Sequence, residues 1–168
     1  TVEIAGVPID GGPDAFLVRE PEMRELCTSL GIAEKLVAPI SRSAKIWVDG
    51  SMKALPKSQF LGIPLDFDEL SSLNLISPEG IAIAQNDLTA KDNAQDEDET
   101  VGSLIRRRLG DEVMEKLVGP LLGGINAGDP DTLSLKSGVP YLASAASLDA
   151  SLVRSIQKFI HASDRNPE

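Results

Sequence analysis

Cysteine, histidine and aromatic side chains are all scarce in this sequence of 168 residues. The only cysteine, Cys27, excludes a disulfide framework and fits a reducing compartment. The only histidine, His161, lies beside a polar C-terminal segment, so a zinc site built from several His and Cys ligands is excluded. A Ser/His/Asp triad would need that same histidine, which makes it a poor explanation of any catalysis.

Positive charge is also in short supply. The sequence has 16 Lys and Arg residues but 26 Asp and Glu residues, so the formal net charge is -10. We expect no nucleic-acid partner, because neutralising phosphates takes clustered cations. No apolar run approaches the ~18 residues of a membrane span, and no signal peptide is visible. We therefore expect a cytoplasmic protein that is peripheral at the membrane at most.

Motifs that bind phosphate or metal are missing as well. The sequence has no G-x-G-x-x-G, and the glycines of "GGINAGD" are not followed by the Lys-Ser/Thr of a P-loop. The acidic run 96–99 lacks the alternating spacing and the glycine of a calcium loop. Local chemistry alone therefore indicates no metal site and no self-contained active site.

The sequence does contain hairpin signals in its first third. Apolar residues alternate on both sides of Ala5-Gly6 and again on both sides of Asp49-Gly50, which predicts β-hairpins over 2–9 and 46–55. Residues 60–63, bounded by prolines, predict a third short strand or an extended edge. Beyond about residue 66 no further strand is expected.

Helical periodicity dominates the remainder. It predicts helices over 21–30, 78–88, 100–109, 111–122 and 148–160. Asp111 is expected to cap the fourth of these helices and Pro120 to kink or break it. The acidic stretch 91–99 is typical of a linker or an exposed loop. Strands first and helices later indicate an α+β fold.

Two local features need an interpretation of their own. Cys27 falls on the apolar stripe of the first predicted helix, which favours a buried small hydrophobe over a reactive thiol. Arg106, Arg107 and Arg108 are consecutive on a predicted helix and fan over roughly 200°. They cannot all face one anion, so we expect solvation and ion pairing with Glu99 or Asp98.

The segment "VEIAGVPIDGGPDAFLVREP" can be interpreted either as a tight turn or as a ligand contact. Two glycines and a proline directly after an alternating run are typical of a tight turn. They also suit a backbone that comes close to a ligand, because glycine has no Cβ. The residues leave both alternatives open.

Three stretches together resemble the protoporphyrinogen oxidases. They are "TVEIAGVPIDGGPDAFLVREPEMRELCTSLGI", "ALPKSQFLGIP" and "DETVGSLIRRRLGDEVMEKLVGPLLGGINAGDPDTLSL", which together cover roughly residues 1–142. The sequence is most similar to the Gram-positive, oxygen-dependent branch that oxidises coproporphyrinogen III. The resemblance implies an FAD enzyme related to the amine oxidases, with a porphyrinogen substrate and oxygen as electron acceptor.

The resemblance also implies that the chain is a fragment, without the FAD fingerprint and the C-terminal half. Residues 1–66 would be the β-rich part of the substrate and FAD-contacting region. Residues 67–163 would be the helical, membrane-binding-type domain, and 164–168 a disordered tail. The intact enzyme would belong to haem biosynthesis, whereas the fragment alone is expected to be inactive, with no FAD bound.

Site residues follow from the resemblance by position. Gly12, Pro13, Asp14 and Ala15 match the segment that passes the flavin. Arg19 and Lys57 are the candidates for contact with the substrate carboxylates. Catalytic residues and metal ligands are not expected here.

Membrane association is expected to be weak or absent, because the acidic stretch 91–99 would be repelled by anionic lipid. Two other functions stay open: a non-catalytic acidic helical interaction domain, and a flavin amine-oxidase-type enzyme with another substrate. The fragment hypothesis predicts an exposed apolar face, through which the chain would associate with itself.

Overall fold

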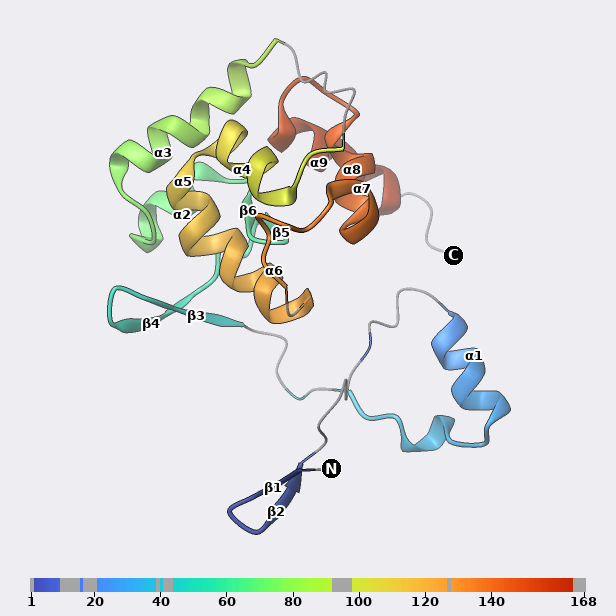
Figure 1. Cartoon of the computed structure of the whole chain (residues 1–168). Coiled ribbons are helices and arrows are strands. Elements are labelled where there is room, and N and C mark those ends of the chain that lie inside the picture. Colours follow the sequence, from blue (N-terminus) through green and yellow to red (C-terminus); the bar gives the residue numbers. More distant parts are fainter. Residues whose placement is uncertain are drawn as a thin grey trace. The chain divides into compact units, whose positions relative to one another are not determined.

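The computed structural model describes residues 2–9, 16, 21–38, 40, 44–91, 98–126 and 128–164. It has the expected α+β character, with short hairpins and many helices (Figure 1). The chain divides into two compact units, Thr1–Arg42 and Ser43–Glu168, and each is described by itself.

The first unit contains one hairpin and one short helical pair. Strands β1 (Val2–Ile4) and β2 (Val7–Ile9) run antiparallel around a turn in which Ala5 and Gly6 both have positive φ. Two such residues make the turn that matches the twist of a two-residue hairpin. Helix α1 (Glu22–Ser29) and the 3₁₀ turn η1 (Ala33–Lys35) follow.

Apolar side chains of the first unit are largely exposed. Val2 lies opposite Ile9 and Ile4 opposite Val7, so one face of the β1–β2 hairpin is aliphatic, and each of these side chains is at least 44 % exposed. In α1, by contrast, Cys27 is buried, which confirms its interpretation as a small hydrophobe. A two-stranded hairpin is only marginally stable in water, so this face is suited to packing against another surface.

The second unit begins with two further hairpins. Strands β3 (Lys45–Val48) and β4 (Ser51–Ala54) pair around Asp49-Gly50, as predicted. Strands β5 (Gln59–Phe60) and β6 (Ile63–Pro64) form a separate hairpin, whereas a single third strand or an extended edge was expected. The positive φ angles of Leu61 and Gly62 explain the difference, because they reverse the chain within two residues.

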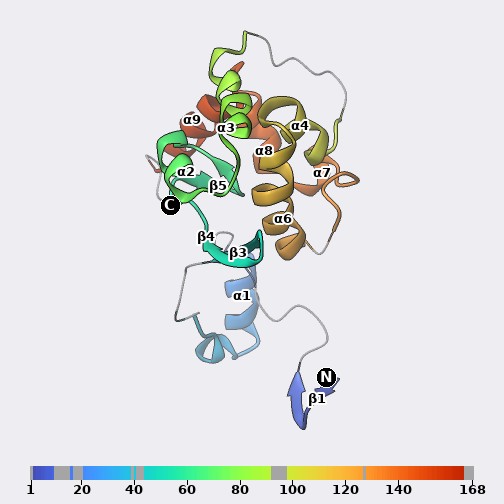
Figure 2. The same ribbon diagram turned by 90° about the vertical axis from the view of Figure 1, so that its left-hand side faces the viewer.

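Helices make up the rest of the second unit. In chain order they are α2 (Phe67–Leu73), α3 (Pro78–Gln85), the 3₁₀ turn η2 (Asn86–Thr89), α4 (Val101–Leu109), α5 (Asp111–Val113), the π-helical turn η3 (Met114–Val118), α6 (Gly119–Asn126), α7 (Leu135–Gly138), α8 (Pro140–Ala146) and α9 (Leu152–Asp164). Both views show α3 to α9 as one group with the β3–β4 hairpin at one end of it (Figures 1 and 2).

Polar side chains begin several of these helices. The Asp66 carboxylate accepts hydrogen bonds from the first amides of α2. The hydroxyls of Ser77, Thr100 and Ser134 do the same for α3, α4 and α7. These side chains satisfy amides that have no partner inside the helix. The helix ends are therefore encoded locally.

One hydrophobic core holds the second unit together. Leu104, Ile105 and Leu109 of α4 are almost fully buried, as their periodicity predicted. They pack in one cluster with Leu142 of α8 and Ile156 of α9, and Ile46 and Val48 join the same cluster. The β3–β4 hairpin is thus tied to the helices by one of its faces. Trp47 and Met52 pair on the other face and are exposed.

Pro120 does not end its helix. The chain stays helical from α5 through η3 to α6, and the Gly119 amide donates to the Met114 carbonyl, five residues back. Proline lacks an amide proton and clashes with the preceding turn of an α-helix, so the wider π turn accommodates it. The predicted break is therefore wrong: the helix continues through Pro120, and a π turn comes just before it.

Other expectations need correction. Asp111 is the first residue of α5 and makes no cap bond there; its carboxylate pairs with Arg106. Helices α2, α7 and α8 were not predicted, and α9 begins at Leu152 because Ser151 caps it. That helix reaches Asp164, and residues 165–168 lie outside the described part. Residues 92–97 of the predicted linker also lie outside it.

Gly62 gives a test of how the β5–β6 turn docks on the helices. A Cβ at Gly62 would lie 2.8 Å from the Leu117 carbonyl oxygen, whereas a Cβ at Gly50 would meet nothing within 4 Å. Both glycines have positive φ, so Gly50→Ala should lower the free energy of unfolding by about 1 kcal/mol. Gly62→Ala should cost a further ~1–3 kcal/mol for the clash. Urea denaturation of both variants measures the difference, and equal losses would contradict the close approach.

Candidate functional site

The predicted site residues lie in different parts of the chain. Gly12, Pro13, Asp14 and Ala15, expected beside a flavin, and Arg19, expected beside a substrate carboxylate, lie outside the described residues. Lys57 is described, and its side chain is exposed in the loop between β4 and β5. The structure therefore positions one of the six candidates.

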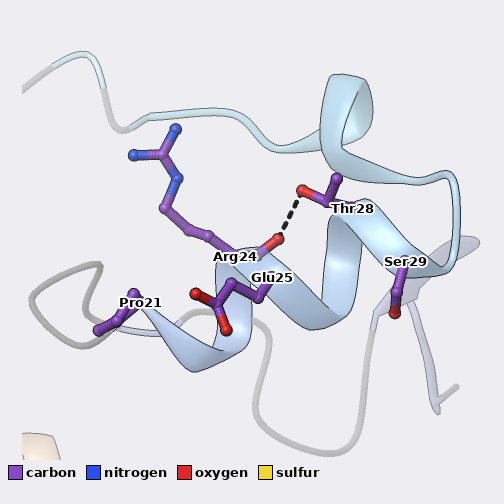
Figure 3. A pocket seen from close by; sticks show the side chains of 5 residues that line it. All are labelled: Pro21, Arg24, Glu25, Thr28 and Ser29. Atoms are coloured by element: carbon purple, nitrogen blue, oxygen red, sulfur yellow. Dashed lines mark hydrogen bonds between the residues drawn. The ribbon is translucent and has the colours of Figure 1, made fainter.

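A hollow of about 480 Å³ lies on one face of α1 in the first unit (Figure 3). Its lining comes from Pro21, Arg24, Glu25, Thr28 and Ser29. The Thr28 hydroxyl donates to the Arg24 carbonyl and the Ser29 hydroxyl to the Leu26 carbonyl, so both donors are used inside the helix. One helix with one charge of each sign does not define a ligand.

The three consecutive arginines of α4 have separate partners. Arg106 pairs with Asp111, Glu115 and Asp131. Arg107 pairs with Glu99, 2.8 Å between Nη2 and Oε1, which confirms one predicted ion pair. They do not share one anion, as the fanning of consecutive helical residues requires.

Arg108 is the third arginine, and it is buried together with Asp87 of η2. The Arg108 Nη2 and the Asp87 Oδ1 lie 2.7 Å apart, and both side chains are at most 7 % exposed. The Asp87 carboxylate also accepts from the Ser151 hydroxyl and from the first amides of α9, at Leu152 and Val153. Arg108 donates in addition to the Ala150 carbonyl.

This buried cluster satisfies both charges. A buried carboxylate is tolerated when it has a partner charge and several donors, and Asp87 has both. A hollow of about 200 Å³ adjoins the cluster and is lined by Ile83, Asn86, Asp87, Ala90, Arg107 and Arg108. Because both arginines already pair with carboxylates, the hollow offers little attraction to an anion.

Other carboxylates fasten neighbouring elements. Lys158, the Ser151 amide and Arg154 all bind Asp149 and hold the pKa of its carboxyl well below the ordinary value. The Ser77 hydroxyl and amide donate to the Glu112 carboxylate, which links the start of α3 to α5. The same hydrogen bonds lower the pKa of Glu112. Both sets of contacts therefore favour the ionised form of the carboxyl group.

Metal and membrane-spanning features are absent from the part of the chain that the structure describes. Nowhere in those residues do three His, Cys, Asp or Glu side chains come together as ligands for an ion. Within the same residues, none of the helices is both long enough and apolar enough to cross a bilayer.

Comparison with known proteins gives the relationship. The model of the family described as "Flavin containing amine oxidoreductase" matches residues 1–162. The chain belongs to this family. The match spans the first hairpin, the segment 12–15 and all the helices up to α9.

Curated relatives of the chain include porphyrinogen oxidases. The coproporphyrinogen III oxidase of Bacillus subtilis is 35% identical over 158 residues, which are 94% of this chain and 34% of the relative. Protoporphyrinogen oxidase 2 of Arabidopsis thaliana is 30% identical over 141 residues, 82% of this chain and 27% of the relative. The chain thus spans about a third of the length of the curated relatives it matches.

A solved structure agrees with the fold. A crystal structure of a protein from Exiguobacterium sp. 255-15, described as a protoporphyrinogen oxidase, superposes with a TM-score of 0.77 at 31% identity. The match covers 88% of this chain and 33% of the other. The α+β arrangement of short hairpins and helices is therefore that of one part of a flavin oxidoreductase.

The described residues of this family member lack one feature of a dinucleotide site. They contain no strand, glycine loop and helix of the kind that cradles the pyrophosphate of a dinucleotide. The segment expected to pass the flavin lies outside the described residues, so we derive no chemical step through the cofactor.

The buried pair gives a stability test. Arg108→Met should lower the free energy of unfolding by about 3–5 kcal/mol, because it leaves the Asp87 charge buried without its partner. Arg107→Ala removes the adjacent ion pair, whose arginine is 35% exposed, and should cost at most about 1 kcal/mol. Thermal and urea unfolding compare the two variants. Similar losses of unfolding free energy in the two variants would show that the burial of the Arg108–Asp87 pair does not determine its contribution to stability.

Asp149 gives a test of pH dependence. Its folded pKa is lowered, so its contribution to stability is complete above the unfolded pKa near 3.8 and is lost as pH falls toward the folded value. Asp149→Asn should lower stability at pH 7 and flatten the loss below about pH 4. Asp68→Asn, which changes an exposed acid of α2, is the control. A wild-type slope in Asp149→Asn would refute the assignment.

Proposed function

We propose that this chain is the substrate-side and helical part of an FAD-dependent oxidase that converts coproporphyrinogen III, or protoporphyrinogen IX, to the porphyrin. The main support is the 35% identity to a coproporphyrinogen III oxidase over 94% of the chain. Coproporphyrinogen III is our first choice because further coproporphyrinogen III oxidases match at 27–35% identity. The pathway would be haem biosynthesis.

The two segments expected from the resemblance would have different roles in this enzyme. Residues 1–66 would face the flavin and substrate, with Gly12, Pro13, Asp14 and Ala15 beside the cofactor. Residues 67–163 would be the helical domain. The exposed aliphatic face of β1–β2 and the exposed Trp47 and Met52 of β3–β4 support packing against protein outside this chain. In isolation the same faces would let the chain associate with itself.

Substrate contact is proposed for Arg19 and Lys57. The substrate carries several carboxylates, and cations held at its edge would pair with them. Lys57 supports this assignment because its exposed side chain has no ion-pair partner among the described residues. Oxygen would be the electron acceptor. Membrane attachment would be weak or absent, and the location cytoplasmic.

The complete gene product that contains this chain provides the direct test. Purified with FAD, it should oxidise coproporphyrinogen III with a higher kcat/KM than protoporphyrinogen IX, seen as porphyrin fluorescence in air. Under anaerobic conditions the porphyrinogen should bleach the flavin absorbance. Flavin reduction by a primary amine and by neither porphyrinogen would favour an amine oxidase. No flavin binding and no reduction at all would favour an interaction domain.

A further inference from the structure

Lys57 lies on a loop whose backbone is fixed on both sides. The Lys57 amide donates to Oε1 of Glu69, and the Ser58 amide donates to Oε2 of the same carboxylate, each at 2.9 Å. The Ser58 carbonyl accepts from the Leu65 amide at 2.9 Å, and Pro56 is buried. The loop can therefore shift little while Glu69 is ionised.

Glu69 is placed for this contact by the start of α2. Asp66 caps that helix and accepts from the Glu69 amide at 3.0 Å. A glutamate three residues after an N-cap ordinarily turns back to the N-cap amide. Here the side chain reaches the neighbouring loop, twelve residues earlier in the sequence, instead. The Lys57 and Ser58 amides hold the pKa of the Glu69 carboxyl below its ordinary value, so the contact is charge-assisted.

Among the described residues, the ammonium of Lys57 lacks contacts of the kind that three of the other lysines in the unit make. Lys53 donates to the Asn74 carbonyl, Lys116 pairs with Glu112, and Lys158 pairs with Asp149. Lys57 is exposed and makes no side-chain bond to the described residues. A cation on a fixed backbone loses less conformational freedom when it binds an anion than one on a mobile loop.

We infer that Glu69 is a positioning residue: its carboxylate fixes the loop from which Lys57 presents its ammonium group to a carboxylate of the porphyrinogen. The inference rests on the proposed function for the identity of the substrate. Glu69 does not touch the substrate; it acts through Lys57. Its effect must therefore vanish when Lys57 carries no charge or when the substrate carries no carboxylate.

A double-mutant cycle in the complete holoenzyme tests the first condition. Glu69→Gln and Lys57→Met should each raise KM for coproporphyrinogen III by about threefold to fivefold, the range of a partly exposed ion pair, with kcat unchanged. In the Lys57→Met background, Glu69→Gln should raise KM no further. Glu79→Gln, the same change at an exposed position in the first turn of α3, is the control and should leave KM unchanged. Independent effects of Glu69 and Lys57, or a fall in kcat, would overturn the inference.

An equilibrium measurement tests the second condition and separates this inference from the proposed function. Binding of coproporphyrin III and of its tetramethyl ester is measured by fluorescence titration, which needs no turnover. Glu69→Gln should weaken binding of the free acid by about threefold to fivefold and leave the ester unaffected. Equal weakening of both would indicate general loss of structure and overturn the inference. An enzyme that binds the acid in this way but oxidises neither porphyrinogen would refute the function and not the positioning.

Discussion

The buried carboxylate of Asp87 is the interaction on which the second unit depends. It joins three elements that are far apart in the sequence: η2, which contains it, α4, through Arg108, and α9, through Ser151 and the first amides of that helix. Removing a carboxylate from water is costly unless its oxygens are fully used. These donors must all reach the same two oxygens. The polar cluster therefore restricts the position of α9 relative to α4 more than apolar packing alone would. The apolar residues on the same helices then complete the core around it.

How much the sequence revealed depends on how local each signal is. The hairpin at Asp49-Gly50 and the helix from Thr100 to Gly110 were predicted because turn, cap and periodicity lie within about ten residues. Helix α2 carries a similar local signal, Asp66 followed three residues later by Glu69, which the periodicity analysis passed over. The fan of the three arginines was also foreseeable, because it follows from helix geometry alone.

Contacts between residues that are far apart in the sequence could not be predicted from local signals. Arg108 meets a partner 21 residues away and Ser151 one 64 residues away, and no spacing rule connects them. The same holds for Glu69 and the Lys57 loop: the capping signal at Asp66 can place the glutamate in the first turn of a helix, but not beside a particular loop. The residues expected at the flavin were proposed from family resemblance. Their chemistry, two glycines and a proline, is equally typical of a turn.

The two units differ in how well their apolar side chains are buried. Ser43–Glu168 has a continuous core, and each arginine of its α4 triplet is paired with a carboxylate, so it has the marks of an independently stable body. The aliphatic side chains of β1–β2 are exposed, although their alternation is as regular as that of β3–β4. A regular apolar alternation is a pattern for burial. Within the proposed enzyme, the aliphatic face of the first unit would therefore pack against the protein that holds the flavin, while the second unit would support the loop from which Lys57 extends. Flavin affinity would then depend on the first unit, whereas substrate affinity would draw on Arg19 of the first unit and Lys57 of the second.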